Sequence, residues 1–520
     1  MTEQPREAPR RRRSGGRAGR IAERQAPPAS AAERPVRPGL PGGRYAPLTE
    51  SDMQQIYDTA LRLLEDTGMG TPIPEFTEVV VDAGGRLDPN GRLHYPRGLI
   101  ERGMELAAKE WIWHGFDDDK SIHVGGDRVH FGTAGAAVLV HDPETNRFRE
   151  STLRDVYDCA RLVDSFEHVH FFGRMCVARD MQTPRDLDIS TAYAVLTGTS
   201  KPSGSAWFDP RHVHETVDMF DIALGGPGEF AKRPFILAYN TFVVPPMRFA
   251  EEANRCMVAQ VETGMPVQLL SAGQAGATAP AALAGALVQG LAECLAGLCN
   301  VNLMRPGHPC VMGLWPFVSD LRTGAMSGGS GEEAVLNAAA AQLLNWLGLP
   351  SAVPASMTDS KLPDSQSGYE KGLTVGLAAN AGANLVMESA GMLASLLACS
   401  PEQLVIDNDM LGAINRTVRG VEVDEGTLSA DVIAEVIAGP GHFLGSDQTL
   451  SLMQTEYVYP IIGDRESPEN WTDAGGLSAL QLAQRRTRQV LAEHYPDHIG
   501  PEVDARIREA FPIRLPSRFS

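Results

Sequence analysis

Short apolar or β-branched runs alternate with longer helical stretches over much of this chain, and this alternation constrains its fold more than any other feature. Strands that are buried on both faces read as continuous apolar runs, and strands separated by helices pair in parallel through crossovers. Eight such units over about 260 residues are the size of a (β/α)8 barrel. We therefore predict an α/β fold whose core is a TIM barrel. The predicted strands cover residues 129–131, 169–172, 204–207, 235–239, 267–270, 310–314, 351–353 and 385–387.

The stretches between these runs have the periodicity of amphipathic helices. Examples are residues 213–224, 248–263, 281–298 and 332–347. An open, doubly wound sheet is the alternative arrangement of the same units. It is disfavoured because no G-x-G-x-x-G sequence opens a helix in this chain.

Composition and periodicity divide the rest of the chain. The first residues are rich in Arg, Pro and Gly and contain no aromatic residue before Tyr45, so they cannot bury enough apolar surface to fold. Helices are predicted over residues 48–67, 96–109, 428–438 and 477–493. The predicted organisation is a disordered tail (1–44), an N-terminal α-rich segment (45–125), the barrel (126–425) and a C-terminal helical extension (426–520).

Charge and cysteine usage exclude several classes of protein. The formal net charge of −19 argues against nucleic acid as a partner, because phosphate neutralisation needs clustered cations. The seven cysteines are scattered and form no C-x-x-C pair, which argues against disulfides and a structural zinc. No apolar run is long enough to span a bilayer, and the N-terminus does not resemble a secretory signal. We predict a cytoplasmic protein with no membrane partner and no metal of its own.

Aromatic residues recur directly after the predicted strands. In a barrel of this kind the active site forms at the carboxyl ends of the strands. Trp207, Tyr239, Trp315 and Phe317 lie at such positions, although aromatic residues make up only 6% of the chain, and Glu388 follows the last strand. A set of aromatic faces with one carboxylate suits a methylated ammonium group, because cation–π attraction replaces its hydration. The alternative is that these rings only fill loop cores.

The polar loop that follows the seventh predicted strand is hard to explain by packing. It contains Asp359, Lys361 and Gln366, and Pro363 stiffens it. At a barrel rim these groups would fix a substrate or a neighbouring loop. The alternative is a solvated turn with internal ion pairs.

Other catalytic patterns are weak. Ser203 and Ser205 lie outside any G-x-S-x-G sequence, and no H-E-x-x-H sequence occurs. The pairs His168/His170 and His212/His214 are each two residues apart, but no third metal ligand is evident beside them. A structural role is the favoured interpretation of these histidines.

Four stretches of this sequence resemble the trimethylamine methyltransferase family, and the similarity extends from about residue 45 to about residue 515. They include Gly273–Thr278, Asp320–Ala325, Thr358–Lys361 with Asp364 and Gln366, and Ile406–Asn408 with Gly441–Leu444. The resemblance implies a barrel methyltransferase that moves a methyl group from an amine to the cobalt of a corrinoid (cobalamin) on a separate small protein. This chain lacks the D-x-H-x-x-G sequence that supplies a histidine to cobalamin, so we expect no cofactor bound by the chain itself.

The substrate class follows from a departure from that family. Its archaeal trimethylamine members carry pyrrolysine close to the position of Met357 and Thr358, whereas this chain has only standard residues there. The chain therefore resembles the pyrrolysine-free branch, whose known members demethylate quaternary amines such as glycine betaine. A quaternary nitrogen leaves as a neutral tertiary amine, so no acid is needed, and the protein mainly aligns the methyl group and excludes water.

The resulting hypothesis is a corrinoid-dependent methyltransferase for a quaternary or tertiary methylamine. Trp207, Tyr239, Trp315 and Phe317 would surround the ammonium and Glu388 would support it. Asp359, Lys361 and Gln366 would hold the other end of the substrate or shape the mouth, with Lys361 or Arg322 paired to a carboxylate. No residue is assigned to catalysis, and assembly into a homo-oligomer is left open.

Two other functional classes remain open from the sequence. The first is a barrel that binds a methylamine or betaine without turning it over. The second is a barrel lyase or hydrolase, which would need an acid/base pair with shifted pKa values at the rim. Glu388 and Asp359 are the candidates for such a pair.

Overall fold

The computed structural model describes residues 37–439 and 441–519. Most of the predicted tail, residues 1–36, lies outside these ranges. Residues 38–419 and 460–519 belong to one compact unit, and residues 420–459 to another that is described separately.

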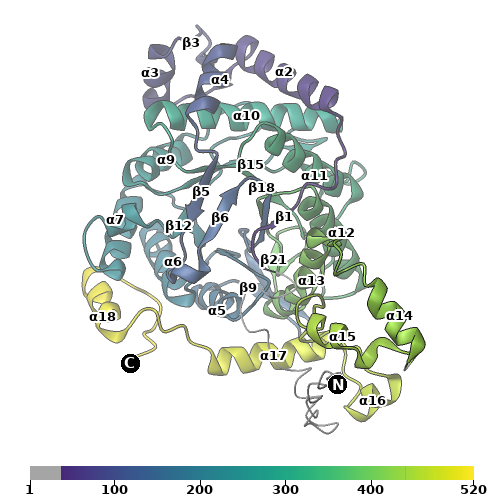
Figure 1. Ribbon diagram of the computed structural model, residues 1–520. Helices are drawn as coiled ribbons and strands as arrows, with labels where there is room; N and C mark the ends of the chain where they lie inside the picture. The colour runs from purple at the N-terminus through teal and green to yellow at the C-terminus, as the bar shows by residue number, and fades with distance from the viewer. Residues whose placement is uncertain (1–36, 440, 520) are drawn as a thin grey trace, which may run out of the picture. The chain divides into compact units, whose positions relative to one another are not determined.

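Eight parallel strands of the larger unit form a closed barrel, which confirms the predicted TIM fold (Figure 1). Hydrogen-bonded neighbours run in the order β7, β19, β18, β15, β13, β12, β11 and β10. A parallel bridge between Gly132 and Phe171 joins the ends of this row, and the backbone nitrogen of His170 donates to the carbonyl of Phe131 at 2.6 Å. The strands are β7 (Arg128–Phe131), β10 (Phe172–Gly173), β11 (Ser203–Ser205), β12 (Ile236–Asn240), β13 (Val267–Ser271), β15 (Cys310–Leu314), β18 (Ser351–Pro354) and β19 (Leu385–Met387).

One long helix follows each strand, and all eight strand positions predicted from the apolar runs are confirmed within a few residues. The helices begin near the carboxyl ends of the strands and return the chain to the amino ends. They are α5 (Leu153–Asp164), α6 (Pro184–Gly198), α7 (Pro210–Leu224), α9 (Glu251–Thr263), α10 (Leu283–Met304), α11 (Gly331–Trp346), α12 (Ser365–Asn380) and α13 (Pro401–Arg419).

The N-terminal part of the larger unit packs on α10. Figure 1 shows α2 (Glu50–Asp66) and α4 (Arg97–Leu106) along this helix. The hydroxyl of Tyr95 donates to the side-chain oxygen of Asn300 on α10 at 2.9 Å. Among the described helices, α10 alone is long and apolar enough to cross a membrane, but 83% of its most apolar window is buried inside the protein. The remaining elements here are β1 (Leu40–Pro41), β2 (Met69–Gly70), α3 (Pro74–Asp82), β3 (Arg86–Leu87) and β4 (Arg92–His94).

A two-stranded hairpin, β5 (Glu110–Trp113) and β6 (Ile122–Gly125), covers the amino ends of the barrel strands. The indole nitrogens of the hairpin donate hydrogen bonds to residues at the beginnings of barrel strands. Trp111 donates to the carbonyl of Cys310 and Trp113 to that of Phe235, each at 3.1 Å. The ring of Trp113 lies 5.0 Å from that of Phe171 inside the barrel. The amino end is therefore filled with tightly held aromatic side chains.

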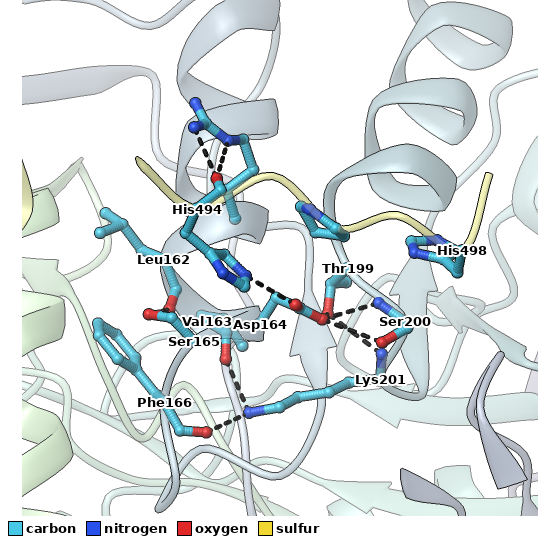
Figure 2. A network of polar contacts seen from close by, with 12 residues as sticks. Leu162, Val163, Asp164, Ser165, Phe166, Thr199, Ser200, Lys201, His494 and His498 are labelled. Atoms are coloured by element: carbon cyan, nitrogen blue, oxygen red, sulfur yellow. Dashed lines mark hydrogen bonds and ion pairs between the residues drawn. The ribbon is translucent and has the colours of Figure 1, made fainter. Parts of the chain in front are cut away.

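A polar network beside this end holds the turns that lead into β10 and β11 (Figure 2). The buried ammonium of Lys201 donates to the carbonyls of Val163, Phe166 and Val169 at 2.7, 2.5 and 2.6 Å. Asp164, at the end of α5, accepts from the backbone nitrogen of Ser200 at 2.9 Å and from His494 at 2.8 Å. The charges in this network have protein partners.

Two small sheets lie on segments that follow the carboxyl ends of barrel strands. One contains β14 (Gln274–Ala275), β16 (Phe317–Ser319) and β17 (Met326–Ser327). The other contains β20 (Met392–Leu393), β21 (Ala398–Cys399), β8 (Leu139–Asp142) and β9 (Arg147–Glu150).

The C-terminal region is helical. In the larger unit α17 (Ala479–Glu493) packs on α13 and α5, and α18 (Pro501–Ala510) packs on α7. The short helix α8 (Glu229–Lys232) lies between α7 and β12, and α16 (Pro468–Asp473) precedes α17. The smaller unit contains α14 (Ala430–Ala438) and α15 (Asp447–Leu452).

Candidate functional site

Strand alternation places a column of large side chains inside the barrel. On β12 the side chain of Leu237 belongs to the interior cluster, whereas those of Ile236 and Ala238 face the helices. Continuing this alternation brings Tyr239 to the carboxyl end of the interior, and the same pattern on β15 brings Trp315 there. The interior cluster is made of Trp111, Trp113, Ile122, Val124, Ala134, Phe171, Leu237, Leu270, Val311, Trp315, Phe317, Ala352, Met357, Leu385 and Met387.

Three of the four predicted rings meet in this cluster. Trp315 and Phe317 are 5% and 9% exposed, and their ring centroids are 6.0 Å apart at 65°. Tyr239 packs against the same cluster. The indole nitrogen of Trp315 and the hydroxyl of Tyr239 are buried and have no hydrogen-bond partner among the described residues.

Two glycines make room for the ring of Tyr239. A β-carbon on Gly173 of β10 would lie 2.3 Å from the tyrosine oxygen, and one on Gly204 of β11 would lie 2.2 Å from Cζ of the ring. Both distances are far below van der Waals contact, so these positions must stay glycine for the ring to lie where it does. Burial raises the pKa of the Tyr239 hydroxyl, and the charge of Glu388 raises it further.

The fourth predicted ring lies elsewhere. Trp207 is buried in the larger core cluster, which lies between the strands and the outer helices, and not in the interior cluster. The next residue, Phe208, donates its backbone nitrogen to Asp188 on α6 at 3.0 Å. The structure therefore does not bring Trp207 together with the other three rings.

Glu388 ends β19 in a strained conformation at the mouth of the barrel. Its φ is +57°, in the left-handed region that side chains other than glycine rarely adopt. The residue is 1% exposed, and neither carboxyl oxygen has a hydrogen-bond partner among the residues that the structure describes. Burial raises the pKa of Glu388 to about 8, although the charge of Lys371 opposes this shift.

A second buried carboxyl, Glu333, was not predicted from the sequence. Ser330 caps α11 by accepting from the backbone nitrogen of Glu333 at 3.2 Å, which fixes this residue in the first helical turn. Glu333 is fully buried, and its two oxygens also have no partner in the described chain. Burial, with the charges of Glu388 and Asp359, raises the pKa of Glu333 well above its usual value, although the side chain of Asn337 opposes this shift.

The lysine that acts on Glu388 is already neutralised. Lys371 on α12 is fully buried and lies 3.1 Å from a carboxylate oxygen of Asp407 on α13. Its ammonium also donates to the carbonyl of Ser356 at 2.6 Å. Lys371 therefore contributes little net positive charge to the two glutamates.

The predicted polar loop forms hydrogen bonds both within itself and to neighbouring segments. Asp359 accepts from the hydroxyls of Ser327 and Ser395 at 2.8 and 2.5 Å, and from the backbone nitrogen of Gly328 at 2.7 Å. Gln366 donates to Glu370 at 2.9 Å. The exposed Lys361 donates to the carbonyl of Asp359 at 2.5 Å.

These contacts hold the loop against its neighbours. Glu370 accepts from the backbone nitrogen of Asp359 at 2.8 Å, and Asp364 caps α12 by accepting from the backbone nitrogen of Ser367 at 3.0 Å. The sequence predicted a polar loop at this position. Its hydrogen bonds join Asp359 and Gln366 to neighbouring parts of the rim.

A cleft of about 450 Å³ opens beside this loop. Asp359 lies on its wall, as do Asp320 and the exposed Arg322, which form an ion pair at 2.7 Å. The full lining is Ala275, Ala281, Leu283, Val318, Ser319, Asp320, Leu321, Arg322, Ser327, Ser330, Glu332 and Asp359. The cleft is thus built from the segments that follow β13, β15 and β18.

Arg174, which follows β10, is a second polar residue that sequence reasoning missed. The residue is 9% exposed, and no hydrogen bond or ion pair joins its guanidinium to any part of the chain described here. Burial lowers the pKa of Arg174, while the charges of Cys176, Asp188 and Tyr239 oppose that shift. Its position directly after a strand was the signal available in the sequence.

The paired histidines have structural partners. His212 hydrogen-bonds Asp188 at 2.7 Å, and the backbone nitrogen of Phe131 donates to Nδ1 of His170 at 3.0 Å. In the described ranges no three His, Cys, Asp or Glu side chains are grouped so as to hold a metal ion.

Comparison with known proteins gives a consistent result. The model of a family described as trimethylamine methyltransferase (MTTB) matches residues 13–515. Glycine betaine methyltransferase from Desulfitobacterium hafniense (strain Y51) is 28% identical over 470 residues, which cover 89% of this chain and 96% of that protein. Trimethylamine methyltransferase MttB from Desulfitobacterium hafniense (strain DSM 10664 / DCB-2) is 29% identical over 468 residues, or 90% and 93% of the two chains.

A solved structure supports the fold. The monomethylamine methyltransferase MtmB of Methanosarcina barkeri superposes with a TM-score of 0.50 and covers 86% of this chain and 89% of its own. The two sequences are only 11% identical, so this likeness concerns architecture alone.

Proposed function

This chain belongs to the trimethylamine methyltransferase family, and from that premise we propose that it transfers a methyl group from a quaternary amine of the glycine betaine type. The acceptor in this proposal is the Co(I) of a corrinoid on a separate protein, which supplies a strong nucleophile for the methyl carbon. We place the reaction in the cytoplasm. The proposal rests on buried carboxyls at the barrel mouth, beside aromatic rings, that accept no hydrogen bond from the described residues.

The ammonium end of the substrate fits the mouth of the barrel. Trp315, Phe317 and Tyr239 offer aromatic surfaces there, and Glu388 offers a carboxyl that no protein donor occupies. Aromatic faces attract a quaternary ammonium more strongly when water is excluded. Met357, close to where the family resemblance puts pyrrolysine, is fully buried in the same cluster, so this position contributes apolar surface.

The carboxylate end of a betaine fits Arg174 better than Lys361. The charge of Asp188 acts on the buried guanidinium of Arg174, but no side chain of the described residues forms an ion pair with it, and a substrate carboxylate would supply such a charge-assisted pair. Lys361 is exposed and already donates to the carbonyl of Asp359. The charges of Glu388 and Arg174 both act on the pKa of the Tyr239 hydroxyl, which supports assigning these two groups to one site.

The proposed reaction requires little acid–base catalysis from the residues of this chain. A quaternary nitrogen keeps the bonding electron pair when its methyl group leaves, so the product is a neutral tertiary amine. The residues at the mouth need only hold the ammonium, orient one methyl group towards the rim and keep water away. The cleft beside Asp359 opens on the same rim, which suits an acceptor brought by a second protein.

A spectroscopic assay tests the proposal. Purified chain is mixed with a corrinoid protein in the Co(I) state, and the visible spectrum is followed after adding glycine betaine, choline or trimethylamine. We expect loss of the Co(I) spectrum with glycine betaine and not with trimethylamine. Binding of glycine betaine without any spectral change would instead indicate a non-catalytic binding protein.

Substitutions at the mouth of the barrel test whether the residues assigned to the site bind the substrate. Trp315→Ala and Glu388→Gln should both weaken betaine binding, since each removes a group that faces the ammonium. Unchanged affinity in both variants would contradict the assignment of this pocket.

A further inference from the structure

The mouth of the barrel contains two buried carboxyl groups, Glu333 and Glu388, whose surroundings do not stabilise both as anions. Glu333 from the first turn of α11 and Glu388 from the end of β19 together present four oxygens without a hydrogen-bond donor in the described chain. By contrast, the buried Glu293 on α10 accepts from Met247, Ser271 and Gln289. An ionised carboxylate without donors in a buried site is unfavourable, so Glu333 and Glu388 need either protons or a cation.

The charged groups around the pair do not supply that cation. Lys371 of α12 is held by Asp407 of α13, and Asp359 adds negative charge that three donors already satisfy. Tyr239 of β12 faces Glu388 as a neutral hydroxyl, because burial raises its pKa. Glu370 also belongs to this surrounding group and accepts from Gln366 and from the backbone of Asp359. The protein surroundings therefore favour the protonated forms.

We propose that Glu333 is the second carboxyl of the ammonium site and that the Glu333–Glu388 pair exchanges one proton for the substrate cation. As the quaternary ammonium enters, one carboxyl releases a proton to solvent and becomes its counter-ion. This inference rests on the proposed function, because it takes the ligand to be a quaternary amine.

The same exchange runs backwards after methyl transfer. The methyl group leaves as the equivalent of CH3⁺, the electron pair of the broken bond stays on nitrogen, and the cationic charge disappears from the pocket. The remaining carboxylate then takes one proton from water, so the net charge of the pocket is restored. A neutral amine next to a neutral carboxyl has no ion pair to hold it, which favours release of the product.

The pH dependence follows from the state of the free protein. Burial raises the pKa of Glu388 to about 8, so this carboxyl is largely protonated at neutral pH, and burial also raises the pKa of Glu333 well above its usual value. A bound cation favours the ionised form, so binding should release close to one proton at about pH 7. Affinity should rise with pH up to about 8 and level off above it, since the carboxyl is then already ionised.

Calorimetry without the corrinoid protein tests the exchange, because no turnover occurs. Binding of glycine betaine and of choline is measured at one pH in buffers with different ionisation enthalpies, and the slope gives the protons released. We expect close to one proton for each ligand with the wild-type chain and none with the double variant Glu333→Gln/Glu388→Gln. Each single variant should still release a proton, with a shifted pH profile, because one carboxyl remains.

Glu402→Gln is the matched control. Glu402 on α13 is also buried with a raised pKa, but it has Ser400 as a hydrogen-bond partner and lies outside the mouth, so its variant should release protons as the wild type does. Binding without proton release, or release that persists in the double variant, overturns the exchange and leaves the proposed function standing. Failure of the wild-type chain to bind either ligand overturns both.

Discussion

The two ends of the barrel differ in whether their buried charged groups have hydrogen-bond partners. At the amino end Lys201 donates to three carbonyls, and Asp164 accepts from several donors (Figure 2). At the carboxyl end Glu333 and Glu388 are just as buried, yet they have no protein partner in the described ranges. Buried polar groups are normally satisfied. The difference indicates that the amino end is built for stability and that the carboxyl end keeps unsatisfied groups for a ligand.

We expect Lys201→Met to have the largest effect, and that effect should be on stability. It removes the donor for three buried carbonyls, so the free energy of unfolding should fall by roughly 3 kcal/mol. Urea denaturation measures this, while methyl transfer per folded molecule should be unchanged. Lys361→Met is the control, because this exposed lysine should change stability by less than about 0.5 kcal/mol. Equal stability of the two variants would contradict the contrast between the ends.

Glu388→Gln should show the reverse behaviour. Methyl transfer from glycine betaine should fall about 100-fold in kcat/KM, because one of the two carboxyls proposed for the ammonium site is lost. Stability should be kept or increased. Since the pKa of about 8 in the folded protein lies above the usual glutamate value of 4.5, the wild type should lose stability as the pH rises from 4.5 through 8.

Thermal melts at several pH values check this second part. The wild-type melting temperature should decline over that interval relative to the variant. A variant that melts well below the wild type at every pH would mean that Glu388 serves the fold and not the ligand.

Arg174→Met should change specificity more than turnover. Loss of the guanidinium removes a charge-assisted pair with the substrate carboxylate, so preference for glycine betaine over choline should fall about 30-fold. Competition assays with the two compounds measure this ratio. Arg322→Met is the control, because Arg322 is exposed at the rim and paired with Asp320. A ratio that is unchanged in Arg174→Met would indicate that this arginine only balances Asp188.

Lys361→Met should have the smallest effect. Its ammonium donates to a carbonyl of its own loop and is otherwise in solvent. We expect KM for glycine betaine to change by less than about twofold. A large increase would return the substrate carboxylate to Lys361, as first predicted from the sequence.

Sequence reasoning found the barrel because buried parallel strands leave a direct trace. Runs such as residues 310–314 are apolar on both faces, and helices separate them. The same reasoning found Tyr239, Trp315 and Glu388, because rim residues follow strands immediately. It also selected Trp207, which follows a strand but is buried in a different cluster from the other three rings. Position along the chain therefore identifies the rim but not the direction of a side chain.

The sequence does not reveal which buried polar groups lack hydrogen-bond partners in the folded protein. Glu332 and Glu333 are adjacent in sequence and both suit a first helical turn, yet only Glu333 is buried without donors. The hairpin around Trp111 and Trp113 was also missed, because that region was assigned to an α-rich segment. Such properties depend on neighbours that are distant in sequence.

The hairpin that fills the amino end has a kinetic consequence. Trp111 and Trp113 occupy that end, so the carboxyl rim serves as the passage for small molecules and also as the face where a methyl-accepting protein would dock. A docked acceptor then covers the route by which an amine arrives or departs. Turnover should therefore follow an ordered mechanism. The amine binds first and the acceptor protein docks second. The demethylated amine dissociates only after the acceptor protein has dissociated.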